Sequence, residues 1–198
     1  MAILVCPWWL AYTFDHRLRR LVHNPSKLFG KYVGSGMTVV DLGCGLGFNT
    51  IGLAELVGDE GHVVALDIQQ KMLNGMMRRA KKMGFEKRIE AHLAKENDLR
   101  LQVNAQFILA FFMVHEVPDP DRLLAQVAEN LSENGRFMMV EPALHVSRKN
   151  FQHGIAQAET SGLVLKDQYK IPFGMTAVFV KAVTPKRTSR RPQRHPFP

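Results

Sequence analysis

The chain has 198 residues, 46% of them hydrophobic, which is enough for one domain to bury a full core without disulfides or a structural metal. Its two cysteines, Cys6 and Cys44, form neither a disulfide framework nor a zinc pattern, so we expect a reducing, cytoplasmic location and no metal site. No apolar run is long enough to cross a membrane, and the apolar start lacks the basic leading region that is typical of a signal peptide.

The formal net charge of +8 is concentrated at the end of the chain. Residues 184–198 carry five basic residues and no acidic residue, so +8 less these five leaves only +3 for the rest. Because this tail is rich in proline and charge and has little to bury, we expect it to be disordered. Basic tails can bind nucleic acid or an anionic surface, but we favour a solubilising role.

Residues 1–36 precede the first predicted strand, and we expect them to form an N-terminal helical cap. They begin with the aromatic stretch Cys6–Phe14 (CPWWLAYTF), and the basic stretch Asp15–His23 then has a helical pattern up to Asn24–Pro25. Ordinary packing against the rest of the protein and a homodimer contact are alternative roles. Tryptophans near arginines also suit a membrane interface, so a peripheral membrane contact stays open.

Residues 37–183 alternate strand and helix signals, which predicts one α/β domain. The predicted strands are Met37–Leu42, His62–Ile68, Arg88–Leu93, Phe107–Val114, Arg136–Glu141, Leu163–Tyr169 and Thr176–Ala182. The predicted helices are Asn49–Val57, Lys71–Met83, Pro120–Leu131 and Ser147–Ser161. In the second helix the methionines, including Met83, fall on one face that we expect to be buried. The last two strands are joined by too few residues for a crossover helix, so this pair should be antiparallel.

A glycine-rich turn follows the first predicted strand. Residues Val39–Thr50 read VVDLGCGLGFNT, so Asp41 is followed by alternate glycines from Gly43 to Gly47 before a helix begins. Glycine has no Cβ, which lets main-chain N–H groups approach a ligand closely. The next strand ends in Asp67, 26 residues after Asp41. A glycine turn followed by an acidic residue on the next strand is how a Rossmann-like sheet holds a nucleoside ribose.

This D-x-G-x-G-x-G pattern with its downstream acidic residue resembles that of the class I S-adenosylmethionine-dependent methyltransferases, over about Met37 to Ala182. The resemblance implies an α/β fold with a Rossmann-like, seven-stranded, mostly parallel sheet, helices on both faces and an antiparallel last strand. It also implies S-adenosyl-L-methionine as cofactor and S-adenosyl-L-homocysteine as product. This cofactor has no phosphate, so a close backbone turn and a carboxylate suffice to hold it.

Ligands of an open α/β sheet bind beyond the carboxyl ends of the strands, which selects the candidate residues. The expected cofactor-binding residues are Asp41, Gly43, Cys44, Gly45, Asp67, Ile68, Glu96 and Asn97. By the resemblance, the turn would hold the methionyl end and Asp67 the ribose hydroxyls. The loop after the third strand would contact the adenine amino group, and there Lys95 replaces the usual acidic residue. We favour Glu96 and Asn97 over Asp98 for that contact.

After the fourth strand the chain reads MVHEVPD from Met113 to Asp119, which is similar to the methyltransferases that act on small molecules, including the quinone-biosynthetic type. His115 would then face the transferred methyl group and could take a proton from an acceptor hydroxyl. Alternatively, His115 only shapes the pocket, since methyl transfer can proceed by proximity and orientation. Glu116 would orient His115 or face solvent, and His145 is a further pocket candidate. In similar methyltransferases an N-terminal segment folds over the cleft, so Trp8 and its neighbours could form a lid.

The sequence therefore predicts an S-adenosylmethionine-dependent methyltransferase with a small-molecule acceptor. Two alternatives stay open: a nucleic-acid or protein methyltransferase that uses the basic tail, and a catalytically silent cofactor-binding protein. The segment after the fourth strand lacks the (Asp/Asn)-Pro-Pro-(Tyr/Phe) motif of the enzymes that methylate base amines or glutamine amides. A nicotinamide-dependent oxidoreductase is disfavoured because the third glycine of G-x-G-x-x-G is missing and the acidic residue lies later than the usual ~20 residues.

Overall fold

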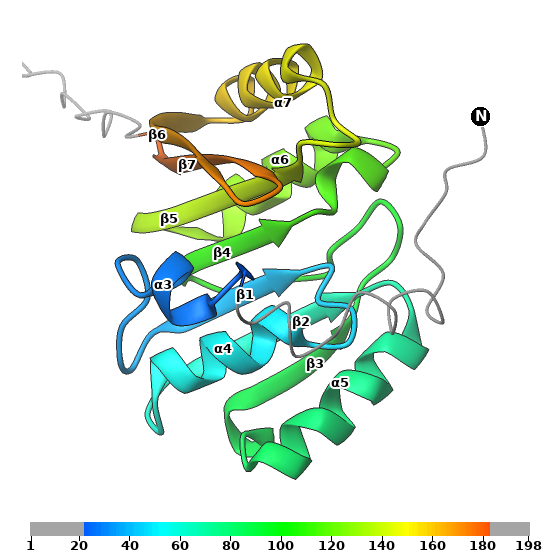
Figure 1. Ribbon diagram of the computed structural model, residues 1–198, viewed down its shortest axis with the longest axis vertical. Helices are drawn as coiled ribbons and strands as arrows, with labels where there is room; N and C mark the ends of the chain where they lie inside the picture. Colours follow the sequence, from blue (N-terminus) through cyan, green and yellow to red (C-terminus); the bar gives the residue numbers. More distant parts are fainter. Residues whose placement is uncertain (1–21, 183–198) are drawn as a thin grey trace, which may run out of the picture.

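A computed structural model of the protein describes residues 22–182 (Figure 1). The predictions for the aromatic stretch, for most of the N-terminal cap and for the basic tail lie outside these residues. Within residues 22–182, no helix is long and apolar enough to cross a membrane.

Seven strands form one sheet in the order β3-β2-β1-β4-β5-β7-β6. The strands are β1 (Thr38–Leu42), β2 (His62–Asp67), β3 (Ile89–Leu93), β4 (Ala105–Phe111), β5 (Leu131–Pro142), β6 (Leu163–Ile171) and β7 (Gly174–Lys181). Neighbouring strands are parallel except for β7, which is antiparallel to both β5 and β6. The predicted fold class and the antiparallel last pair are both confirmed. The order reverses beside β1, so β1 and β4 end at the point where α/β sheets bind ligands.

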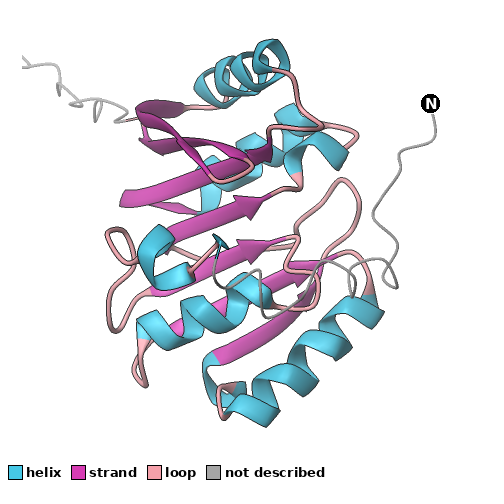
Figure 2. Cartoon of the chain, viewed as in Figure 1, coloured by secondary structure: helices cyan, strands magenta, loops and turns pink. Residues whose placement is uncertain are grey.

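Helices cover both faces of the sheet (Figure 2). The α-helices are α3 (Pro25–Phe29), α4 (Phe48–Val57), α5 (Gln70–Met83), α6 (Pro120–Asn130) and α7 (Arg148–Thr160), and two short 3-10 helices, η1 (Glu86–Arg88) and η2 (Val114–Glu116), lie between them. Because successive side chains of a strand point to opposite faces, Val39 packs in the cluster under α3, α4 and α5, while Val40 packs under α6 and α7. The central strands are thus buried on both sides, and the carboxyl ends of the strands remain available for a binding site.

Two local expectations were wrong, and a third residue has an additional role. Strand β4 ends at Phe111 and not at Val114, because Phe112 has a positive φ of 60° and reverses the chain. Met83 is 42% exposed, since α5 turns its last residue beyond the sheet before Gly84 ends the helix. Asn24, expected to stop a helix, also begins α3: its side chain accepts hydrogen bonds from the N–H groups of residues 26 and 27.

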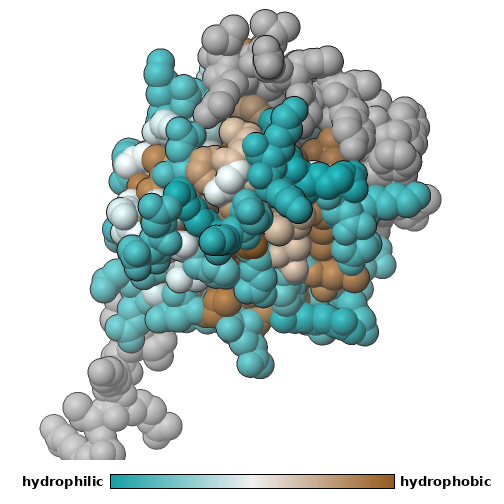
Figure 3. Space-filling view, turned by 90° about the horizontal axis from the view of Figure 1, so that it is seen from below, coloured by the Kyte–Doolittle hydropathy of each residue, from teal (hydrophilic) through white to brown (hydrophobic). Residues whose placement is uncertain are grey.

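Most basic residues of α5 lie in solvent, with Arg78, Lys81 and Lys82 exposed, whereas Arg79 is half-buried and its guanidinium donates to the Leu46 carbonyl at 3.5 Å. Figure 3 views the molecule from the end of the sheet where α5 and β3 lie, and hydrophilic residues cover much of that face. The charge on this surface therefore belongs to an ordinary solvated helix face.

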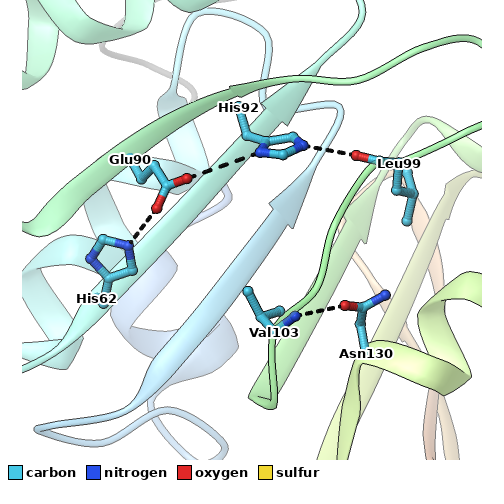
Figure 4. A network of polar contacts seen from close by, with 6 residues as sticks. All are labelled: His62, Glu90, His92, Leu99, Val103 and Asn130. Carbon is cyan, nitrogen blue, oxygen red and sulfur yellow. Dashed lines mark hydrogen bonds and ion pairs between the residues drawn. The ribbon is translucent and has the colours of Figure 1, made fainter.

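A polar network anchors the long segment between β3 and β4 (Figure 4). Glu90 contacts His62 at 3.2 Å and His92 at 4.0 Å, and the His92 Nε2 lies 2.9 Å from the Leu99 carbonyl oxygen. Further along, Asn130 accepts a hydrogen bond from the Val103 N–H at 2.9 Å. These contacts satisfy backbone groups that no strand pairs, and they fix the loop that carries Glu96 and Asn97.

Candidate active site

The glycine turn between β1 and α4 is built from left-handed backbone. Gly43, Gly45 and Gly47 have φ values of 64°, 53° and 80°, a conformation that residues with a Cβ adopt at a cost. The Cys44 N–H donates to the Leu66 carbonyl at 2.8 Å, which ties the turn to the end of β2. The alternation of glycines is therefore a backbone requirement of this turn.

The three glycines have different surroundings. A Cβ at Gly43 would lie 3.1 Å from the Met113 side chain, and one at Gly47 would lie 2.4 Å from the Met76 Cγ. A Cβ at Gly45 would meet nothing within 4 Å. Gly43 and Gly47 thus let neighbouring elements pack against the turn, while Gly45 leaves open space in which a ligand can approach the backbone.

Asp41 and Cys44 lie under the turn. Asp41 is 1% exposed and accepts a 2.6 Å hydrogen bond from the Thr50 hydroxyl, so its carboxylate braces the turn against α4. Burial, and after it the negative charges of Asp41 and Asp67, raise the pKa of the Cys44 thiol well above its ordinary value. Cys44 is therefore a neutral thiol at neutral pH, and any contact it makes with a ligand would come from its backbone.

Asp67 joins the end of β2 to the turn. Its Oδ2 accepts the Gly45 N–H at 3.0 Å and its Oδ1 accepts the Gln69 N–H at 2.8 Å. Burial raises the pKa of Asp67, although the hydrogen bonds from Gln69 and Gly45 oppose that shift. Each carboxylate oxygen keeps a further acceptor site, so the two oxygens can hold the adjacent hydroxyls of a ribose. Ile68, next to Asp67, is an apolar side chain that is 42% exposed.

Glu96 and Asn97 lie on an exposed turn after β3. Backbone hydrogen bonds of 2.9 and 3.2 Å between Lys95 and Asp98 close this turn, and the Ala94 N–H donates to the Asp67 carbonyl at 3.1 Å. The start of the loop is thus next to Asp67, but the side chains of Glu96 and Asn97 are in solvent. Their contact with adenine stays a prediction.

His115 is paired with a residue that the sequence did not single out. Its Nδ1 lies 2.5 Å from the Glu141 Oε2, and the other oxygen of Glu141 accepts the Val114 N–H at 3.1 Å. Glu116, predicted either to orient His115 or to face solvent, lies 4.0 Å from the ring at Nε2. Glu141 is therefore the residue that orients the ring. The rule that selects carboxyl ends of strands also applies to Glu141, the last acidic residue of β5.

The pair sets the proton affinity of the imidazole. Burial lowers the pKa of His115, but the hydrogen bond and charge of Glu141, with a further contribution from Glu116, outweigh burial and raise the pKa above the ordinary value for histidine. Glu141 is 3% exposed, so it cannot move to solvent without breaking the core. With Nδ1 held by the carboxylate, Nε2 is the nitrogen that can accept a proton.

An aromatic cluster lies at the end of β4, on the face of the sheet that α3, α4 and α5 cover. The ring of His23 packs edge-on against Phe111 and Phe112, with centroids 5.4 and 5.8 Å apart, and its Nε2 lies 2.7 Å from the Pro172 carbonyl oxygen. His23 is 5% exposed and was not predicted as a site residue. His145, a predicted pocket candidate, instead lies on an exposed turn after β5. Residues 22–182 contain no cluster of side chains that could hold a metal ion.

Comparison with protein families matches residues 34–174 to the family described as "Methyltransferase domain". The chain belongs to this family. Its methyltransferase domain therefore uses S-adenosylmethionine, and the open face of Gly45 next to Asp67 fits the cofactor's backbone and ribose requirements.

Three relatives illustrate the range of this methyltransferase domain. It is 32% identical over 119 residues to the demethylmenaquinone methyltransferase of Lactobacillus johnsonii, covering 58% of this chain and 48% of the relative. It is 28% identical over 123 residues to the carboxy-S-adenosyl-L-methionine synthase of Dichelobacter nodosus, covering 61% and 51%. A SAM-dependent methyltransferase from Aquifex aeolicus has the same fold, with a TM-score of 0.81, 22% identity, and coverage of 90% of this chain and 100% of that one. The matched segment spans about half the length of the curated relatives.

Proposed function

We propose that the protein transfers a methyl group from S-adenosylmethionine to a small apolar or aromatic acceptor, with His115 as the base. The observation that best supports this proposal is the His115–Glu141 pair, because a buried carboxylate that orients an imidazole is an arrangement suited to proton transfer. The pair is close to the cofactor turn: Met113, two residues before His115, lies where a Cβ of Gly43 would point.

The cofactor residues have separate roles in this proposal. The backbone from Gly43 to Gly45, braced by Asp41 beneath it, holds the methionyl end. Asp67 accepts the two ribose hydroxyls, and Ile68 covers one face of the adenine. Glu96 and Asn97 contact the adenine amino group from the next loop.

When bound, the cofactor supplies an electrophilic methyl carbon on a sulfonium. The acceptor atom forms a bond to that carbon, the carbon–sulfur bond breaks, and its electron pair stays on sulfur. His115 Nε2 takes the proton that leaves the acceptor, and Glu141 stabilises the imidazolium that results.

The acceptor class rests on the relatives. The 32% identical protein from Lactobacillus johnsonii is named for demethylmenaquinone, and a flat, apolar ring of that kind is the acceptor that we favour. Cytoplasmic location and a homodimer stay predictions. The nucleic-acid alternative also stays a prediction, since the basic tail lies outside the described residues.

Ligand-induced thermal stabilisation tests the cofactor part of the proposal. A ligand at about a hundred times its Kd stabilises by roughly 2.7 kcal/mol, which shifts Tm by several degrees in a domain of this size. We expect S-adenosylmethionine and S-adenosylhomocysteine to give this shift and NAD to give none. Asp67→Asn keeps the shape of the side chain but should lose most of the shift, whereas Asp167→Asn, on an exposed strand, should keep it. An Asp67→Asn shift equal to that of the wild type would remove Asp67 from the ribose site.

A second candidate is a reaction on the cofactor itself, favoured by the 28% identity to a carboxy-S-adenosyl-L-methionine synthase. Mass spectrometry of the cofactor recovered from the folded protein distinguishes the two. An unmodified cofactor, turned over only when a quinol-like acceptor is added, supports methyl transfer. A carboxylated cofactor would support the second candidate.

A further inference from the structure

Two large apolar side chains stand out on the surface. Leu144 is 84% exposed and Phe173 is 63% exposed, while the other exposed large hydrophobic residues among residues 22–182 lie between 39% and 43%. Single exposed hydrophobic residues are common, but two with most of their surface in water are not required by packing.

These two residues are neighbours at the carboxyl end of the sheet. The Ala143 N–H donates to the Phe173 carbonyl oxygen at 2.9 Å, which joins the segment after β5 to the turn between β6 and β7. In Figure 1 that turn and that segment lie at the end of the sheet where β1 and β4 also finish. Glu141 of the candidate active site lies at the end of β5, three residues before Leu144.

Phe173 also breaks a local rule. Its φ is 58°, in the left-handed region where glycine is the usual residue, so an exposed phenylalanine there has unfavourable backbone and unfavourable hydration. A two-residue turn that starts with Pro172 would normally take glycine next. The stability of the fold therefore gives no reason for a phenylalanine at this position.

The charged residues of the two segments that carry the pair are all basic. Residues 143–150 and 168–175 contain Arg148, Lys149 and Lys170, all exposed, and no acidic residue. Asp167, just outside the second segment, is paired with Lys31 at 3.3 Å. Arg148 and Lys149 lie in the first turn of α7, where a helix favours negative charge, so helix stability does not explain them either.

We propose that Leu144 and Phe173 insert into an anionic lipid bilayer while Arg148, Lys149 and Lys170 contact its headgroups. A small apolar projection ringed by cations suits shallow insertion at an anionic surface. A second copy of the chain is a poorer fit, because a stable dimer needs about 800 Å² from each partner and the same cations would face each other. The attachment does not depend on the role of His115, and it would present the site to lipid-soluble acceptors.

Vesicle co-sedimentation of the full chain tests this surface, without cofactor or acceptor. The vesicles are phosphatidylcholine alone, or phosphatidylcholine with a third of phosphatidylglycerol. We expect binding to the anionic vesicles only. Leu144→Ser with Phe173→Gly should weaken it at least about tenfold, since each loses the burial of a large apolar side chain. Met83→Ser with Val164→Ser is the matched control. These two exposed residues lie away from Leu144 and Phe173, so this variant should bind as the wild type does.

A second comparison of two double variants tests the role of positive charge in this binding. Arg148→Gln with Lys149→Gln should weaken binding by roughly fivefold for each charge, whereas Arg78→Gln with Lys82→Gln, on the α5 face, removes the same charge and should have little effect. The basic tail is present in every variant, so its contribution cancels in each ratio. Equal binding by all four variants would overturn the proposal. So would a wild-type dimer in sedimentation equilibrium that the Leu144/Phe173 variant converts to monomer.

Discussion

Replacing Glu141 by glutamine is the sharpest test of the His115 site. The variant keeps the size of the side chain but removes the charge that faces His115 Nδ1 at 2.5 Å. Burial of His115 remains and lowers its pKa, while the largest opposing contribution is gone. We therefore expect the pKa of His115 to fall from above its ordinary value of 6.5 to below it.

The same change alters stability in a direction set by linkage. Because the pKa of folded His115 is raised, the pair stabilises the protein fully below pH 6.5, and that stabilisation is lost as pH rises through the raised pKa. Side-chain exposures of 26% for His115 and 4% for Glu141 place the pair mostly out of water. Hydrogen bonds to charged groups at such sites contribute about 1.5–3 kcal/mol, so Glu141→Gln should cost about that much near pH 6 and less near pH 9.

Urea unfolding at the two pH values and an NMR titration of the His115 ring measure both effects. Glu116→Gln is the matched control: its carboxylate lies 4.0 Å from Nε2, so it should lower the pKa of His115 less. If methyl transfer uses His115 as base, the acid limb of its pH profile should follow the measured pKa. An unchanged His115 titration in Glu141→Gln, or a stability loss that does not vary with pH, would refute the coupling.

Three further results are expected. Gly47→Ala should lower the free energy of unfolding by about 2–4 kcal/mol in urea titrations, since its Cβ would lie 2.4 Å from the Met76 Cγ on a left-handed backbone. Gly45→Ala, with nothing within 4 Å, should cost only about 1–2 kcal/mol of backbone strain yet abolish the thermal shift with S-adenosylmethionine; a retained shift would move the cofactor away from Gly45. Cofactor affinity by calorimetry should fall as pH is lowered through the raised pKa of Asp67, at higher pH than for an exposed aspartate, and a pH-independent affinity would contradict ribose binding by its carboxylate.

Much of the fold could be predicted because its signals are local. The apolar run before Asp41, the alternate glycines and the acidic end of the next strand lie within about thirty residues, and each reports a backbone or burial requirement of its own segment. The short connection between the last strands likewise allowed only an antiparallel pair. The family resemblance supplied the expectation of seven mostly parallel strands, whereas the order of the strands came only from the structure, because local pattern does not contain it.

The errors arose where distant segments meet. Val114 has a strand-like pattern with the residues before it, but the chain turns at Phe112, whose ring contacts His23, which in turn bonds to the Pro172 carbonyl of the β6–β7 turn. Met83 lies on the apolar face of α5, yet it is exposed because that face extends beyond the part of the sheet that buries it. A periodic pattern shows which face is apolar, but it does not show where the partner surface ends.

By itself, the sequence determined the class of fold, the position of the glycine turn and the acidic residue that ends the next strand, because glycine geometry and strand burial act on neighbouring residues. Only the tertiary structure decided that Glu141, and not Glu116, orients His115. Only the tertiary structure decided, too, that Leu144 and Phe173 lie together at the carboxyl end of the sheet. Those pairs are separated by 26 and 29 positions along the chain and meet because β5 lies between β4 and β7. Their chemistry depends on strand order, which is set by the packing of the whole sheet.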